Sequence, residues 1–181
     1  MPKPFFSQSH NKIIQEIIRV NHAGEFGAQK IYQGQIRYTR NLKNQQVLKH
    51  MLEQEQEHLD YFTDKIQKGC SRPTILIPIW SIGGYLTGSL SAIISIKLAM
   101  IVTENVEIII ENHYSSQITY LKENDSEHPM LKKIEKFKSD EVEHKNLATT
   151  FRKKTDCKLN SFIGSFVQII CKTAIFLSTK I

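Results

Sequence analysis

Hydrophobic residues recur at intervals of three and four along most of the chain, which is the spacing of one face of an α-helix. This pattern predicts five helices, over residues 11–39, 42–68, 97–122, 128–154 and 158–181. Gly69 and Pro73 predict the end of the second helix, and turn-forming residues around Asn124 separate the third from the fourth. Strand-like alternation is confined to residues 74–79. The pattern therefore predicts an all-α fold.

Charged residues interrupt the apolar stripes at corresponding places in four of these helices. The first and third helices each carry one Glu inside the stripe. The second and fourth each carry a Glu-x-x-His phrase, whose two members lie about one turn apart on the same face. The residues are Glu25, Glu55, His58, Glu107, Glu141 and His144. Because burying a lone carboxylate is very costly, we expect these acids to share a positive partner.

The order Glu, then Glu-x-x-His, occurs twice and predicts an internal repeat of residues 11–68 and 97–154 within a single domain that spans residues 1–181. In an antiparallel helix pair, two residues are level when they are equally far from the turn. Arg40 lies midway between the two acids of the first repeat, and Asn124 midway between those of the second. Two hairpins with acids at one level predict a ferritin-like four-helix bundle whose halves are joined by a long crossover.

The crossover, residues 74–96, contains no charged residue and is long enough to span a bilayer. Pro78 and Gly88 weaken the case for a simple transmembrane helix. A span would also place the two Glu-x-x-His phrases on opposite sides of the membrane, where they could not share a site. We therefore expect the crossover to lie in the membrane interface, on the same side as the bundle, together with the amphipathic C-terminal helix.

A metal centre explains the six polar residues together. Four carboxylates carry four negative charges, and two divalent ions would neutralise them. Ligation by carboxylate and imidazole, without thiolate, suits iron or manganese better than zinc. Glu104 lies three residues before Glu107 on nearly the same face, so the pattern leaves both open as the ligand of the third helix.

Several neighbours of the acids are candidates for supporting roles. His22, one turn before Glu25, is expected to donate a hydrogen bond behind the ligands, whereas His113 is either such a donor or an ordinary helix residue. Gly24 and Gly27 lie within a helix, where they either allow close helix approach or leave room for a substrate.

Composition and charge limit the classes of molecule that the protein is expected to bind. The formal net charge of +6 suits an anionic lipid surface or a nucleic acid. The basic residues are scattered and form no platform with aromatic residues between them, so no nucleic acid is expected to bind. The three cysteines have no zinc spacing and favour reduced thiols. No leader features precede the first helix, which favours the cytoplasmic face of a bacterial inner membrane over a mitochondrion.

Three other functions fit part of the pattern. A ferritin-like iron oxidase or storage protein would share the bundle, but the apolar crossover does not suit a cage. A di-iron hydroxylase of modified tRNA would use the positive charge, and salt-sensitive RNA binding would support it. A non-catalytic quinone-binding scaffold would not need a complete ligand set.

The chain resembles the demethoxyubiquinone hydroxylase family of ubiquinone biosynthesis over nearly its whole length. The resemblance is carried by residues 17–28, 55–59, 72–74, 78–80, 106–107, 113–114, 140–144 and 174–178. The segment around Glu25 is the most specific. Asn21 is a departure, because the family usually carries Asp at that position.

The resemblance implies that the six residues bind two ferrous ions, and it favours Glu107 over Glu104. It further implies a di-iron monooxygenase that uses O₂ to hydroxylate the ring of a polyprenylated demethoxy-benzoquinol. Such an enzyme would be peripheral to an anionic membrane and would meet other ubiquinone-biosynthesis proteins. The sequence has no nucleotide-binding fingerprint, so the source of electrons is left open.

Overall fold

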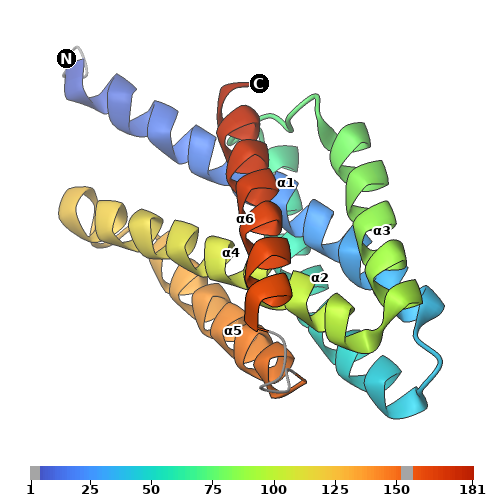
Figure 1. Cartoon of the computed structure of the whole chain (residues 1–181). Coiled ribbons are helices and arrows are strands. Elements are labelled where there is room, and N and C mark those ends of the chain that lie inside the picture. Colours follow the sequence, from blue (N-terminus) through green and yellow to red (C-terminus); the bar gives the residue numbers. More distant parts are fainter. Residues whose placement is uncertain (1–4, 152–156) are drawn as a thin grey trace.

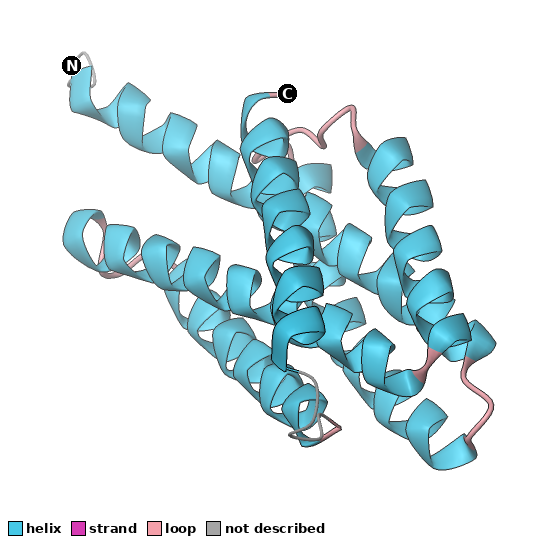
Figure 2. Ribbon diagram, in the orientation of Figure 1, coloured by secondary structure: helices cyan, strands magenta, loops and turns pink. Residues whose placement is uncertain are grey.

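The computed structural model describes residues 5–151 and 157–181, and over these residues it is helical throughout apart from short connections (Figure 1, Figure 2). The helices are α1 Phe5–Tyr38, α2 Leu42–Gln67, α3 Ile77–Ile94, α4 Ile96–Asn124, α5 Met130–Thr150 and α6 Cys157–Lys180. The all-α prediction is confirmed. The strand-like alternation of residues 74–79 is not realised within the described chain, because Pro78 lies in the first turn of α3.

The helix bounds differ from the predicted ones mainly at two ends. α1 begins at Phe5 rather than at residue 11, and the hydrogen bond of 2.9 Å between His10 Nδ1 and Tyr120 Oη ties this extension to α4. The fourth predicted helix was expected to reach residue 154, but α5 ends at Thr150 and residues 152–154 lie outside the described residues.

Two antiparallel hairpins, α1 with α2 and α4 with α5, form the predicted ferritin-like four-helix bundle (Figure 1). The crossover is the helix α3, which lies along α1, and α6 crosses the bundle over α1 and α4. Because α3 returns the chain to the same bundle, it does not separate the two hairpins. The predicted additional C-terminal helix is confirmed.

Local capping sets the ends of the bundle helices. Asn41 begins α2 by accepting a backbone N–H of its first turn at 3.1 Å. Gly69, with φ of 75°, ends α2, and the N–H of Cys70 closes back onto the carbonyl of Lys65 at 3.0 Å. Ser95 caps α4 directly after α3 ends. The predicted end of the second helix at Gly69 is confirmed.

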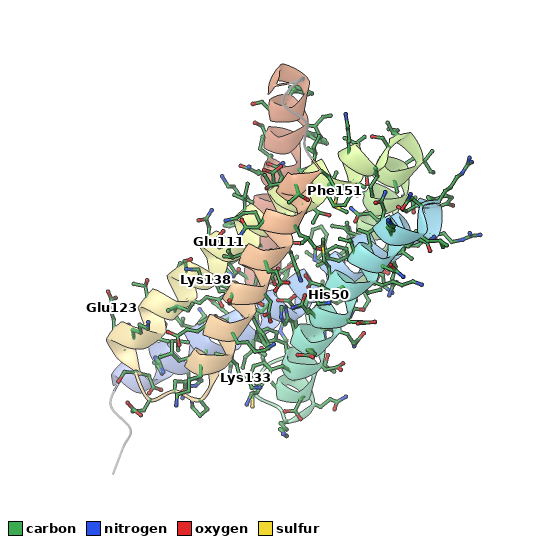
Figure 3. The ribbon with its side chains drawn as sticks, turned by 90° about the horizontal axis from the view of Figure 1, so that it is seen from below. His50, Glu111, Glu123, Lys133, Lys138 and Phe151 are labelled. Carbon is green, nitrogen blue, oxygen red and sulfur yellow. The ribbon has the colours of Figure 1, made fainter. Side chains whose placement is uncertain are left out.

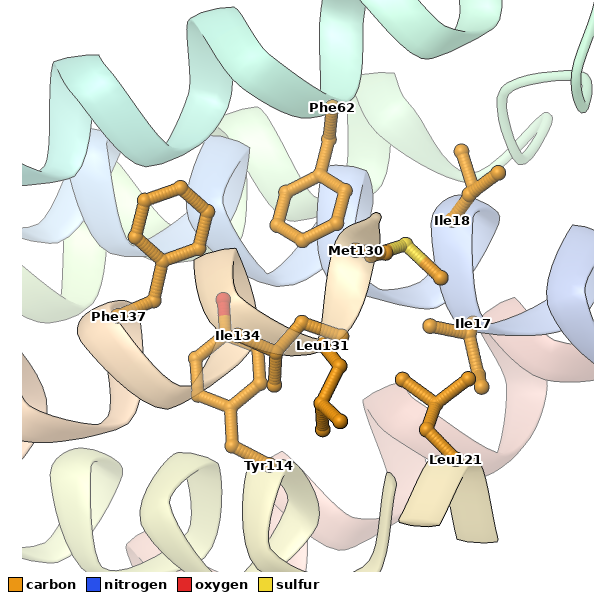
Figure 4. Packing of buried hydrophobic residues seen from close by; sticks show 9 residues of the cluster. All are labelled: Ile17, Ile18, Phe62, Tyr114, Leu121, Met130, Leu131, Ile134 and Phe137. Atoms are coloured by element: carbon orange, nitrogen blue, oxygen red, sulfur yellow. The ribbon is translucent and has the colours of Figure 1, made fainter. Parts of the chain in front are cut away.

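Two apolar clusters fill the bundle on either side of a polar layer. The first lies toward the α4–α5 turn and includes Phe62, Tyr114 and Ile134 (Figure 4). The second comprises Tyr32, Leu48, Met51, Met100 and Ala148. In each bundle helix, the residue two turns before the Glu of the apolar stripe belongs to one cluster. The residue two turns after that Glu belongs to the other cluster. The acids are therefore held between two dry layers.

α1 and α3 pack backbone against backbone through glycine. A methyl group at Gly88 would lie 2.0 Å from the carbonyl oxygen of Ile31, and one at Gly84 would lie 2.8 Å from that of Gly27. Gly34 meets the backbone of α3 in the same way. Only glycine permits this approach, which brings the crossover into direct contact with the bundle.

The surface has an apolar side and a charged side. By length and composition alone, Ile77–Ile94 of α3 and Ser161–Lys180 of α6 are apolar enough to cross a membrane. Their exposed large side chains include Ile79, Ile82, Leu86, Leu90, Phe162, Phe166, Ile169 and Phe176. Figure 3 shows the outer face of α2 and α5, where Lys133 and Lys138 project from the ribbon.

We predict that Gly88→Ala destabilises the protein, because its methyl group would collide with the backbone of α1. We expect a loss of about 1–3 kcal/mol in the free energy of unfolding, measured by denaturant titration in detergent. Gly83→Ala is the matched control on the same helix: its methyl group meets nothing within 4 Å, so a better helix former should stabilise the protein by up to ~1 kcal/mol. Equal effects of the two variants would contradict the packing described.

Candidate metal centre

All six acidic and imidazole residues expected from the sequence meet inside the bundle. Their donor atoms form two groups, in each of which the atoms lie within 4.8 Å of one another. The first group is Glu25, Glu55, His58 and Glu141, and the second is Glu55, Glu107, Glu141 and His144. Glu55 and Glu141 belong to both groups. Each group could hold one cation, and Glu55 and Glu141 could contribute to both.

Burial of the six side chains is nearly complete, with at most 1% of each residue exposed. α1 and α4 supply one Glu each, and α2 and α5 supply one Glu and one His each. Glu104, the competitor of Glu107, is also buried, but its Oε1 accepts a hydrogen bond of 3.3 Å from Thr149 and it belongs to neither group. The structure thus brings Glu107 to the site and directs Glu104 elsewhere.

Two tyrosines that the sequence analysis did not single out hold the acids of α1 and α4 crosswise. Tyr32 of α1 donates to Glu107 Oε1 at 2.7 Å, and Tyr114 of α4 donates to Glu25. Burial, and then the neighbouring carboxylates, raise the pKa of both phenols well above the usual value, so both remain protonated donors. A signal did exist: each Tyr lies two turns after the Glu of its own helix.

The two imidazoles are oriented alike. Each turns Nδ1 toward the carboxylates: His58 Nδ1 lies 3.2 Å from Glu141 and His144 Nδ1 lies 3.3 Å from Glu55. Each turns Nε2 outward to an acceptor, which is Asp140 at 3.0 Å for His58 and Gln54 at 2.9 Å for His144. A proton fixed on Nε2 leaves the Nδ1 lone pair for a cation.

Without a cation the charges of the site are poorly matched. Burial, and then the other carboxylates, raise the pKa of Glu55 and of Glu107 well above the usual value. Burial would also raise the pKa of Glu141, but the adjacent imidazoles of His144 and His58, whose Nδ1 atoms lie 3.4 and 3.2 Å from its oxygens, outweigh burial and lower that pKa to about 2. Carboxylates so close together disfavour each other's charged form.

Several donor atoms of the cluster also lack a hydrogen-bond partner within the described chain. They are Glu25 Oε2, both oxygens of Glu55 and of Glu141, Glu107 Oε2, and Nδ1 of His58 and of His144. Buried polar atoms ordinarily have a hydrogen-bond partner. A set of carboxylate oxygens and imidazole nitrogens that all lack one and lie close together therefore needs an explanation. Metal ions would provide it, and the carboxylate and imidazole chemistry of these residues fits such a site.

The two further histidines occupy the margin of the site. Burial lowers the pKa of His22, and it lowers that of His113 to about 4, so both rings are neutral at pH 7. His22 Nδ1 and His113 Nε2 are buried and have no hydrogen-bond partner among the described residues. The donor role expected for His22 is not formed through Nδ1; the tyrosines supply the hydrogen bonds to the acids of α1 and α4.

An apolar cavity of about 310 Å³ lies beside the α1–α4 seam. It is lined by residues of α1, α3, α4 and α6, among them Gly24, Trp80, Val106 and Cys171. Gly24 and Val106 each directly precede an acid of the cluster. A methyl group would meet nothing within 4 Å at either Gly24 or Gly27, and both line the cavity, so both glycines leave open space. Of the two roles expected for these glycines, the structure supports open space; close helix approach instead requires Gly34, Gly84 and Gly88.

Comparison with known proteins identifies relatives over most of the chain. The family model described as "Ubiquinone biosynthesis protein COQ7" matches residues 12–178. A Dictyostelium discoideum protein is 39% identical over 174 residues, covering 94% of this chain and 78% of the relative. A human protein is 35% identical over 173 residues, covering 93% and 78%. Both are named NADPH-dependent 3-demethoxyubiquinone 3-hydroxylase, mitochondrial.

A bacterial relative extends the comparison. The 3-demethoxyubiquinol 3-hydroxylase of Rhodospirillum rubrum is 38% identical over 136 residues, covering 75% of this chain and 63% of the relative. The match of the family model spans all six residues of the metal cluster and both tyrosines. This chain therefore belongs to the family of the ubiquinone biosynthesis protein COQ7.

Proposed function

We propose that this chain is a di-iron monooxygenase that uses O₂ to hydroxylate the ring of a polyprenylated demethoxy-benzoquinol in ubiquinone biosynthesis. The observation that carries the proposal is the pair of four-residue groups that share Glu55 and Glu141, next to an apolar cavity. The names of the Dictyostelium, human and Rhodospirillum relatives give the substrate class and the reaction.

Glu25, Glu55, His58, Glu107, Glu141 and His144 are proposed as the ligands of two ferrous ions. When bound, such ions supply the electrons and the Lewis acidity that O₂ activation needs. The protein's own contribution is positional. The two tyrosines fix the carboxylates of α1 and α4, and the outward hydrogen bonds of the imidazoles fix the ligands of α2 and α5. The apolar clusters on both sides keep water out.

The cavity is proposed to bind the quinol. Its apolar walls suit an isoprenoid substituent, and two of its lining residues, Gly24 and Val106, directly precede the acids of α1 and α4. Cys171 lines the same space as a free thiol, and burial raises its pKa to about 12, so it stays protonated. Electrons are proposed to come from a reduced nicotinamide, because the Dictyostelium and human relatives are named NADPH-dependent.

The apolar side of the bundle is proposed to face a membrane. α3 and α6 expose large apolar side chains and also form walls of the cavity, so a lipid-soluble substrate would reach the cavity from the bilayer. The net charge of +6 favours an anionic surface. Relatives are both mitochondrial and bacterial, so the cytoplasmic face of a bacterial inner membrane stays a prediction, as do contacts with other ubiquinone-biosynthesis proteins.

Glu107→Ala should lower the iron content from about two ions per chain to one or fewer and abolish hydroxylation, because it removes a ligand of one position. Iron is measured after anaerobic loading with Fe²⁺ and desalting. Glu104→Ala is the matched control, a buried acid one turn away on the same helix that belongs to neither donor group. It should retain both ions, and loss of iron in this variant alone would reverse the assignment.

Filling the cavity should reduce turnover without reducing stability. Gly24→Leu places a side chain in open space beside Glu25 and replaces glycine within a helix, so the free energy of unfolding should rise by up to ~1 kcal/mol. Conversion of a demethoxy-quinol in vesicles should fall at least about ten-fold, the effect of losing ~1.4 kcal/mol of binding, with iron content unchanged. Gly24→Ala should lie between the wild type and Gly24→Leu. Full activity of Gly24→Leu would exclude this cavity as the quinol site.

Polar substitutions on the apolar side should weaken membrane binding. Ile82 and Phe166 are 64% and 59% exposed and do not line the cavity. Losing the transfer of each side chain into lipid costs about 1.5–3 kcal/mol, so Ile82→Asn with Phe166→Asn should reduce co-sedimentation with phosphatidylglycerol-containing vesicles by more than about ten-fold. Iron content should not change. Undiminished sedimentation would show that α3 and α6 do not form the membrane contact.

A further inference from the structure

The contacts around the cluster occur in corresponding pairs from the two hairpins. Tyr32 with Glu107 corresponds to Tyr114 with Glu25. One turn farther out, two further links cross from α1 to α4: Gln35 Nε2 donates to Thr103 Oγ1 at 3.2 Å, and the amides of Asn21 and Gln117 exchange two hydrogen bonds of 2.8 Å. Thr103 and Asn21 each lie four residues before the Glu of their helix, and the two glutamines each lie ten residues after it.

One corresponding pair differs in charge: the two residues that accept hydrogen bonds from the imidazole Nε2 atoms. Each imidazole donates through Nε2 to a residue of the other helix that directly precedes a shared Glu: Gln54 precedes Glu55, and Asp140 precedes Glu141. Gln54 and Asp140 therefore occupy equivalent places. Gln54 presents a neutral amide oxygen to His144. Asp140 presents a carboxylate to His58: its Oδ2 lies 3.0 Å from His58 Nε2 and 3.0 Å from Lys136 Nζ. The two imidazoles therefore differ in what holds their Nε2 proton.

The cation beside Asp140 does not cancel this difference. Lys136 Nζ lies 3.0 Å from Asp140 Oδ2, but it also lies 3.3 Å from Glu57 Oε2. Two carboxylates and one ammonium group leave one negative charge behind His58. Asp140 is only 13% exposed in its side chain, so water screens its effect on the imidazole weakly.

The two donor groups are otherwise matched. Each contains three carboxylates and one imidazole, and Glu55 and Glu141 are common to both. In each, the carboxylate that is not shared accepts a hydrogen bond from one buried tyrosine. An anionic acceptor on Nε2 raises the electron density at Nδ1 and strengthens it as a ligand, whereas an amide oxygen does so less.

We infer that the two metal positions are inequivalent: the ion bound by His58 is held more tightly than the ion bound by His144, and Asp140 and Gln54 are the positioning residues that set this order. The inference rests on the proposed di-iron centre. It assigns no ligand beyond the six described, and it concerns the order and strength of ion binding rather than the hydroxylation itself.

Release of iron to a chelator tests the order. The full chain is loaded anaerobically with Fe²⁺, and ferrozine absorbance follows the loss of iron in the absence of O₂ and substrate. The wild type should lose two ions in two resolved phases. Asp140→Asn keeps the shape of the acceptor and removes its charge, so the slow phase should accelerate by about ten-fold or more. Gln54→Glu adds the charge on the other side and should slow the fast phase.

Glu57→Gln is the matched control, because it removes a negative charge that also contacts Lys136 but does not contact the imidazole. Because the carboxylate that accepts from His58 Nε2 stays in place, the slow phase of this variant should accelerate far less than that of Asp140→Asn. Mössbauer spectra of the wild type loaded with one equivalent of iron should show one dominant doublet, and spectra of Asp140→Asn should show two. Circular dichroism confirms folding of each variant.

Two outcomes would overturn the inference: release of both ions in a single phase from the wild type, or release phases that neither Asp140→Asn nor Gln54→Glu changes. A wild-type chain that binds no iron would instead contradict the proposed function, so the two failures are distinguishable.

Discussion

The structure depends on keeping four carboxylates and two imidazoles together in the dry interior of a helical bundle. Isolated buried charges of this number would unfold a protein of this size, because each costs far more than the net stability of a domain. Three features offset this cost: imidazoles next to the carboxylates, hydrogen bonds from Tyr32 and Tyr114 to Glu107 and Glu25, and an arrangement of ligand atoms that could hold cations. The clusters two turns away on either side keep the four acids at one level.

The peripheral helices follow from the same constraint. On the proposed function, a quinol would have to reach the acids of α1 and α4 without admitting water, so its approach would have to be apolar along its length. α3 provides one wall by contacting α1 through Gly84 and Gly88, and α6 provides another from across the seam. Outward, the same two helices expose apolar side chains. The cavity therefore lies between the charged interior and the side that we propose faces lipid.

Most of the bundle and its cluster could be predicted because a few spacings determine them. The midpoint Arg40 lies in the observed connection between α1 and α2, the midpoint Asn124 is the last residue of α4, and capping at Gly69 ends α2 as expected. Periodicity could not separate Glu104 from Glu107, since residues three apart share nearly one helix face. Tyr32 resembled any core residue, because its role appears only when the hydroxyl meets Glu107 of another helix. Backbone contact at Gly88 likewise depends on packing rather than on local pattern.

Asn21 stands where the family resemblance leads us to expect Asp. Its contacts show how the surroundings of the cluster accommodate an amide at this position. Asn21 and Gln117 are both buried, and each donates to and accepts from the other at 2.8 Å. An Asp at this place could accept from Gln117 but could not donate to it in its charged form. It would also add a carboxylate one turn from Glu25. The amide completes the pair without charge, so the departure preserves the link between α1 and α4 and leaves the negative charge of the layer with the residues proposed to bind metal.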